Sequence, residues 1–189
     1  QVYNIVTIGT QTWFAENLRY AGSIPQVIGN QNWASQTQPA WCYYDDNSSI
    51  GATYGKMYNW YAVNTGSLCP SGWHIPTDAE WTVLTDYLGG QNIAGAAMKT
   101  TTGWDDNTGA TNSSGFTAIP GGRRKPDLGN QNSGDSGGLG VVANFWSSSE
   151  EIISSISYGV SRNLGTSTNI VSRFTVLQEA GNSCRCLQD

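Results

Sequence analysis

The sequence is poor in charged residues. Lys, Arg, Asp and Glu together make up 12% of its 189 residues, about half of the share found in ordinary globular proteins. The net charge is −5, and the densest basic cluster is Arg123-Arg124-Lys125, so we expect no basic surface that would bind nucleic acid. An apolar run of about 18 residues, which a membrane-spanning helix needs, is also absent. We therefore expect no nucleic-acid partner and no direct membrane insertion.

Histidine is nearly absent as well. His74 is the only one, which excludes a zinc site built from several histidines. It lies between Trp73 and Ile75 beside a turn. We interpret it as a hydrogen-bonded structural residue rather than a catalytic base.

The chain is rich in Gly (23), Tyr (9) and Trp (8), and neutral polar residues are common. This composition is typical of secreted, β-rich and carbohydrate-facing proteins. Because the chain begins at Gln1, we expect a processed or excised segment. The four cysteines stand at positions 42, 69, 184 and 186. Their even number favours disulfides and an oxidising compartment, although three pairings are open and four free thiols remain an alternative.

One stretch, residues 69–82, combines a turn with a helix start. Thr77 is followed three residues later by Glu80, which is the spacing of a capping box. The helix expected over 78–88 places Trp81, Leu84 and Leu88 on one face and ends at Gly89-Gly90.

Elsewhere the pattern predicts short strands and long loops. Strands are expected at residues 3–9, 13–14 after a turn at 11–12, 116–120, from 144, 156–164, 169–177 and 182–188. Helical segments are expected at 15–20, near 57–61, at 78–88 and at 93–99. Residues 21–53 and 123–140 are expected to be loops. The fold class is α+β, with two or three short helices, antiparallel strands and long loops in a single domain over 1–189.

Several motifs resemble one known family. They are Val6–Leu18, Tyr54–Tyr61, Cys69–Trp81, Gly115–Gly122, Trp146–Glu150 and Arg162–Leu164. In this order they are similar to the Fibrobacter succinogenes major paralogous domain, found in secreted and surface proteins of Bacteroidetes. The motif Pro76–Trp81 also resembles the formylglycine-generating-enzyme and C-type lectin-like group. The resemblance implies a C-type lectin-like fold whose C-terminal strands and loops display a binding surface.

The sequence departs from the family near its end. Family members end in a motif like Gly-Phe-Ser-Val-Arg-Cys, whereas this chain has Gly181-Asn-Ser-Cys-Arg-Cys186. Cys186 takes the family's cysteine position, and the resemblance makes Cys69–Cys186 the preferred disulfide. Within residues 144–186, Ser, Thr, Ile, Val and Phe occupy places where the family has Asn or Tyr. The segment looks like the variable region of a diversity-generating retroelement target protein; ordinary divergence is the alternative.

Residues 165–176 pattern poorly as a core strand, because both faces mix polar and apolar residues. An exposed apolar patch rimmed by hydroxyls often marks an interaction site. We predict that the ligand-binding residues are Arg123, Arg124, Ile152, Ile153, Thr166, Thr168, Ile170, Ser172, Phe174 and Val176. The alternatives are that one face is core and that the basic cluster is a solvated loop.

Metal binding has weak support. The loops Asp45-Asp46-Asn47 and 105–109 offer oxygen ligands that would suit calcium, but solvated turns explain them better. We expect no cofactor, with calcium the one cation left open, and no catalytic residue.

The resulting function hypothesis is a non-enzymatic, extracellular or cell-surface binding domain, or one on a phage virion. Its partner would be a protein or glycan receptor on another cell or surface. The alternatives are an oxidase of the formylglycine-generating type acting on a cysteine peptide, with Cys184 and Cys186 as its pair, and a structural surface module.

Overall fold

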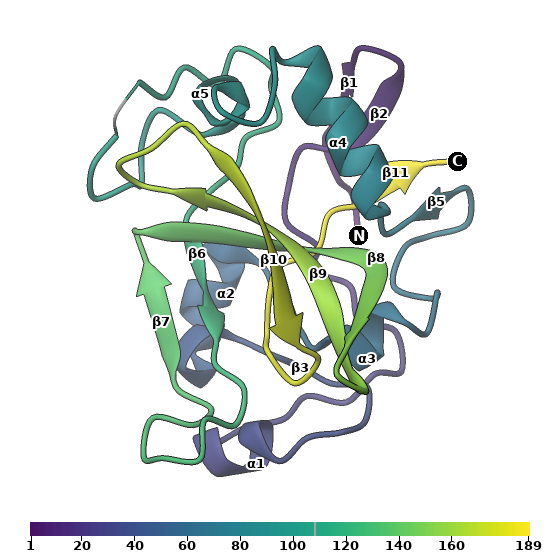
Figure 1. The fold of residues 1–189 in the computed structure, drawn as a ribbon, viewed down its shortest axis with the longest axis vertical. Helices are drawn as coiled ribbons and strands as arrows, with labels where there is room; N and C mark the ends of the chain where they lie inside the picture. Colours follow the sequence, from purple (N-terminus) through teal and green to yellow (C-terminus); the bar gives the residue numbers. More distant parts are fainter. Residues whose placement is uncertain (108) are drawn as a thin grey trace.

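The computed structural model describes residues 1–107 and 109–189, and it combines antiparallel sheets with short helices (Figure 1). Its strands are β1 (Ile5–Ile8), β2 (Gln11–Phe14), β3 (Trp41–Cys42), β4 (Met57–Tyr58), β5 (Trp73–His74), β6 (Gly121–Arg124), β7 (Ser136–Leu139), β8 (Val142–Ile153), β9 (Ile156–Gly165), β10 (Val171–Leu177) and β11 (Leu187–Gln188). Its helices are α1 (Asn30–Ala34), the 3₁₀ turn η1 (Tyr44–Asp46), α2 (Ser48–Tyr54), α3 (Trp60–Val63), α4 (Asp78–Tyr87) and α5 (Ala94–Met98). None of these helices is long and apolar enough to cross a bilayer. The combination of mostly antiparallel strands with short helices confirms the predicted α+β class.

The largest sheet has the order β10-β9-β8-β6-β7. The long strands β8 and β9 form its centre and cross the middle of Figure 1, with α4 above them and β10 in front. β8, β9 and β10 are antiparallel, whereas β6 joins β8 in parallel through Gly122 and Ala143. A second sheet, β1-β2-β11-β5, holds both ends of the chain together, and β3 pairs with β4.

α4 anchors the larger of the two main cores. Thr77 and Glu80 form the predicted capping box, so the local signal at the helix start is confirmed. Trp81 and Leu84 are fully buried. Trp81 lies 4.9 Å from the ring of Trp13 and 5.6 Å from the ring of Phe145, centroid to centroid. This aromatic cluster fixes the helix between the two sheets.

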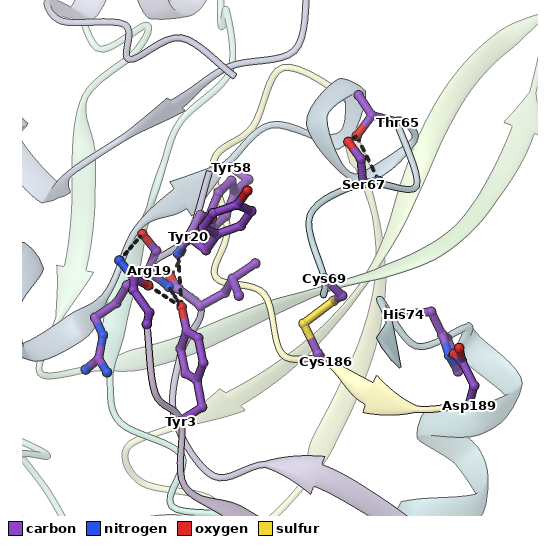
Figure 2. The surroundings of a disulfide bond; sticks show 12 residues. Tyr3, Arg19, Tyr20, Tyr58, Thr65, Ser67, Cys69, His74, Cys186 and Asp189 are labelled. Carbon is purple, nitrogen blue, oxygen red and sulfur yellow. Dashed lines mark hydrogen bonds and ion pairs between the residues drawn. A yellow bond between two sulfur atoms is a disulfide. The ribbon is translucent and has the colours of Figure 1, made fainter. Parts of the chain in front are cut away.

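The C-terminal segment passes through the middle of the molecule. Asn182 pairs with Tyr58, and Ser183 lies beside Phe145 of β8. The disulfide then joins Cys186 to Cys69 with a Cα–Cα distance of 5.9 Å (Figure 2). The predicted Cys69–Cys186 pairing is therefore confirmed, and its presence is compatible with an oxidising compartment.

Arg185, next to the bridge, is fully buried. Its guanidinium donates to the carbonyl oxygens of Phe14, Phe116 and Thr117 and to Asn17 Oδ1. Burial lowers its pKa to about 9. These bonds tie the C-terminal segment to the end of β2 and to the loop at residues 116–117, which is a structural role.

Several predicted boundaries are wrong. The hairpin turn is at residues 9–10 rather than 11–12, residues 15–20 form no helix, and the expected strand 116–120 is displaced to β6. Residues 21–53 contain α1, β3, η1 and α2, and residues 123–140 contain β7 and part of β6. The described helices therefore exceed the two or three expected. The missed elements are short and depend on distant partners, which local patterns do not report.

Candidate functional site

The two faces of the β8–β9–β10 region serve different purposes. Residues that pair across antiparallel strands point to the same side of the sheet. One side carries the paired rows Trp146–Ser161–Phe174 and Asn144–Asn163–Ser172. The other side carries residues of the main core and two arginines, namely Phe145, Leu164, Val171, Arg162 and Arg173.

The arginine side is held by the start of α4. Asp78 Oδ1 accepts from Arg162 at 2.6 Å, and its Oδ2 accepts from Arg173 at 2.7 Å. Arg162 and Arg173 are directly opposite each other in the register of β9 and β10, so the shared carboxylate offsets a like-charge contact. Arg173 also pairs with Glu151 at 3.3 Å. This network fixes the position of β10.

The other side opens into a groove of about 420 Å³. Its walls come from β10 and β9, from β6 and the segment after it, and from the turn that follows β10. The lining residues are Arg123, Lys125, Pro126, Leu128, Asn144, Tyr158, Ser161, Asn163, Phe174, Thr175, Val176, Leu177, Ala180 and Asn182. We call this set the β10 groove.

The β10 groove combines apolar area with positive charge. Phe174 is 51% exposed and supplies its largest exposed apolar surface. Arg123 is exposed and Lys125 is half-buried, while none of the residues that line the groove is acidic. In a chain of net charge −5, this makes a local basic site.

The floor of the groove is polar and pre-arranged. Asn163 Nδ2 donates to Asn144 Oδ1 at 2.7 Å, and Asn144 Nδ2 donates to the carbonyl oxygen of Gly122 at 3.4 Å. Both amides are thereby oriented by the protein itself, with Asn144 almost fully buried. Ordered amides beside an apolar wall are a common way of fixing a ligand's orientation.

The structure brings together three of the predicted ligand-binding residues, Arg123, Phe174 and Val176, in the β10 groove. Ser172 lies on the same side of β10, paired with Asn163, but outside the lining set.

The prediction for Arg124 is corrected. Arg124 is fully buried, with Nη1 at 3.1 Å from Asp46 Oδ1 and Nη2 donating to Asn30 Oδ1 at 2.8 Å. Because alternate residues of a strand point to opposite sides, Arg123 faces solvent where Arg124 cannot. Arg124 joins β6 to η1 and α1 and is unavailable to a ligand.

Thr166, Thr168 and Ile170 are also placed differently from the prediction. They precede β10 in a turn rather than sharing a strand face with Phe174. The Lys99 ammonium donates to the carbonyl oxygens of Thr166 and Thr168, which holds this turn over α5. Ile170 is 41% exposed there. The three residues therefore lie outside the β10 groove.

Ile152 and Ile153 occupy the tip of the β8–β9 hairpin. They are 72% and 46% exposed, and Ile156 beside them is 50% exposed. Ser154 and Ser155 both have positive φ, as a two-residue type I′ turn requires. The tip is an apolar surface separate from the lining of the β10 groove.

Sequence reasoning missed most of the groove lining. Leu128, Tyr158 and Asn182 come from three separate segments, and only the fold brings them together. The predicted ligand-binding residue Arg123 lies in this region, but no local signal singles out Leu128, Tyr158 or Asn182.

A second hollow of about 390 Å³ lies beside the disulfide. Its lining includes Tyr3, Tyr20, Ser67 and Cys69, several of which are drawn in Figure 2. None of the predicted ligand-binding residues lies in it. The β10 groove is therefore the better candidate, since it joins the predicted residues to an oriented polar floor.

Two side chains considered for catalysis, His74 and Cys184, are hydrogen-bonded within the protein or buried. His74 Nδ1 lies 2.7 Å from Asp189 Oδ1 and its Nε2 lies 3.1 Å from Glu80 Oε1. Burial opposes protonation, but the hydrogen bonds and charges of Asp189 and Glu80 outweigh it and raise the His74 pKa. Cys184 is free and fully buried, and burial raises the pKa of its thiol.

The first of the loops suggested for calcium already uses one of its carboxylates. Asp46 accepts from the Gly29 N–H and from Arg124, so its charge is already compensated. Thr108, in the second loop, lies outside the described residues. Among the described residues, no group of three or more His, Cys, Asp or Glu side chains is placed to hold a metal ion.

Comparison with known proteins gives one relationship. Residues 6–188 match the model of the Fibrobacter succinogenes major domain. The chain belongs to this family. No curated protein and no solved structure matches it. The family resemblance predicted from the motifs is confirmed over almost the whole chain.

Most motif residues of the Fibrobacter succinogenes major domain lie on the scaffold, and Asn163 is the exception, because it lines the groove. Thr77 and Glu80 cap α4, Trp146 donates its indole N–H to the Tyr58 carbonyl oxygen at 2.7 Å, and Cys186 closes the disulfide. Arg162 holds Asp78 on the core side of the sheet. In this domain the motif residues build the frame on which the groove lies.

Proposed function

We propose that this domain is a non-enzymatic ligand-binding module whose binding site is the β10 groove. The observation that carries the proposal is the convergence of Arg123, Phe174 and Val176 with two oriented asparagines in one open groove. An exposed aromatic residue beside fixed polar groups is a typical binding arrangement. The partner is a protein or glycan receptor on another cell or surface.

The proposal includes an extracellular or cell-surface location and a C-type lectin-like scaffold. The Cys69–Cys186 disulfide supports the location. The scaffold is supported by α4 packed behind a sheet that displays its opposite side, and by family motifs that hold this frame.

We further propose that residues 144–186 are diversified by a retroelement. The support is the separation of roles within β10, where Val171 is buried in the core while Phe174 faces solvent. The test is genomic: an Asn-rich template copy of this coding segment beside a reverse transcriptase gene. A genome with the parent gene and no such template would contradict diversification without affecting the binding proposal.

An oxidase of the formylglycine-generating type is disfavoured by the cysteines. Cys186 is already bridged to Cys69, and Cys184 is fully buried with a raised thiol pKa. Thiolates, not buried thiols, act as nucleophiles and metal ligands. The two residues therefore do not form a reactive pair.

The binding proposal is tested on an array of glycans and bacterial and host surface proteins. Phe174→Asp should abolish binding to whichever receptor is found. Val83→Asp is the matched control, because Val83 is 49% exposed on α4, outside the groove lining. No receptor on the array, or equal loss with both variants, would contradict the proposal, as would binding that survives replacement of residues 166–176.

A further inference from the structure

β10 is an edge strand with an unused backbone. It is the first strand in the order β10-β9-β8-β6-β7, and it pairs with β9 without interruption from Val171 to Leu177. A row of unpaired N–H and C=O groups at a sheet edge is a template for another strand.

The direction of these groups follows from Val171. Its N–H donates to the Gln91 carbonyl oxygen at 2.7 Å, and Gln91 is not part of β9, so this N–H points away from β9. Successive residues of a strand point their backbone groups to opposite edges. The N–H and C=O groups of Arg173 and Thr175 therefore point outward as well. Among the described residues β10 pairs with no strand other than β9, and no backbone hydrogen bond from a turn or loop uses these groups.

The edge lacks most of the features that usually block strand addition. β10 has the sequence Val-Ser-Arg-Phe-Thr-Val-Leu, which contains neither Pro nor Lys, and its register with β9 shows no bulge. Its one charged residue, Arg173, is held on the core side of the sheet by Asp78 and Glu151. Its residues favour extended structure. Proteins that avoid edge pairing protect such strands with Pro, Lys or bulges.

The edge and the β10 groove share four residues, Phe174 to Leu177. A strand added to β10 would point every second side chain to the side on which the groove opens. The basic residues there, Arg123 and Lys125, have no acidic neighbour in the lining. Charge complementarity therefore favours an incoming segment with carboxylates among its groove-facing side chains.

We propose that the β10 groove binds an extended, acidic and β-branched polypeptide segment of a partner protein, which adds to β10 as an additional strand. This inference rests on the proposed binding function and names its ligand class. A second copy of this chain is disfavoured as the occupant, because pairing two β10 edges would bring two basic grooves together.

The test starts from the biotinylated full chain used to select from a random twelve-residue peptide library. The enriched peptides should alternate Val, Ile or Thr with Glu or Asp. A synthetic copy of the best peptide is then titrated by fluorescence anisotropy. Arg123→Glu should weaken its binding about tenfold or more, since it reverses the charge that faces the carboxylates.

The strand pairing itself is tested at Thr175. Thr175→Pro removes an outward N–H and no hydrogen bond of the β9–β10 ladder, and an edge strand tolerates Pro at such a position. It should raise the peptide Kd about tenfold or more, whereas Thr175→Val, which keeps the N–H and the β-branched shape, should change it less than about threefold. A circular dichroism spectrum matching the native one confirms that the proline variant is folded.

A second experiment keeps the native protein and changes the peptide instead. The same peptide N-methylated at alternate amides should lose binding to the native chain, because it cannot donate to β10. Peptides that bind Thr175→Pro as well as the native chain, or that bind after N-methylation in both registers, would overturn strand addition. Self-association of the native chain that Thr175→Pro abolishes would replace the partner with a second copy.

These experiments distinguish a failure of strand addition from a failure of the proposed binding function. If Phe174→Asp abolishes binding to the array receptor but Thr175→Pro leaves it unchanged, the groove is a binding site and strand addition is wrong. If neither substitution affects receptor binding, the groove itself is wrong as the binding site.

Discussion

The disulfide between Cys69 and Cys186 should be the largest single contribution to stability that one covalent change can remove. The two cysteines are 117 residues apart. In the chain-entropy model a cross-link that closes a loop of this length lowers the entropy of the unfolded chain by about 16 cal/mol/K. At 25 °C this corresponds to about 4–5 kcal/mol of folding free energy.

The perturbation is the double substitution of both cysteines by alanine. The free energy of unfolding should fall by about 4–5 kcal/mol in urea denaturation followed by tryptophan fluorescence. The m-value should rise at the same time, because the chain without its cross-link unfolds to a more expanded ensemble with more exposed surface. The rise in m separates an effect on the unfolded state from a simple loss of packing.

Cys184→Ala is the matched control, since Cys184 is also buried and lies two residues from Cys186. It removes one sulfur from the same segment without opening a loop, so it should cost about 1 kcal/mol with m unchanged. A double variant that loses less than about 1 kcal/mol, or that matches Cys184→Ala in both quantities, would refute the entropic reasoning.

Three further substitutions test contacts that stabilise the fold. Asp78→Ala should lower the free energy of unfolding by about 2–4 kcal/mol, because it leaves a buried arginine without its counter-ion, whereas Asp86→Ala on the exposed side of the same helix should stay within about 0.5 kcal/mol in the same urea titration. His74 has a raised pKa, so its stabilising effect is complete below its unfolded pKa and lost as pH rises through the folded value; His74→Gln should flatten the fall in Tm as the pH rises above the ordinary histidine value of 6.5. Gly159→Ala would place its Cβ 2.4 Å from the Trp60 ring and should cost about 1–3 kcal/mol of unfolding free energy, while Gly137→Ala, whose nearest neighbour is 3.7 Å away, should be nearly neutral. Unaltered stability in Asp78→Ala or Gly159→Ala, or an unchanged pH slope in His74→Gln, would contradict the corresponding argument.

Local signals in the sequence predicted local structure well. The capping box at Thr77 and Glu80, the helix α4 and the later strands β8, β9 and β10 were expected close to their observed bounds. Each depends on side chains within a few residues of one another, which is the information that a sequence pattern carries.

Features that depend on distant contacts were not predictable in the same way. The period-2 pattern extended β10 backward through Thr166, but the buried Lys99 binds the carbonyl oxygens of that segment and bends it over α5. Arg124 was expected at a binding rim, yet Asp46, 78 residues earlier in the chain, holds it inside. The residues that neighbour Lys99 and Arg124 in the sequence do not indicate that a distant partner compensates the burial of each charge.

The two sides of β10 explain how the same strand can be fixed in place and remain open to change. Val171 fills the core and Arg173 reaches Asp78, so the position of the strand is determined by its core side. Phe174, which points the other way, is half exposed and meets the groove. Because strand side chains alternate, a substitution at Phe174 changes the groove without touching the core contacts that hold the strand. Binding specificity can therefore change on this frame at little cost in folding stability, which is what a domain needs if it is to present different ligand surfaces.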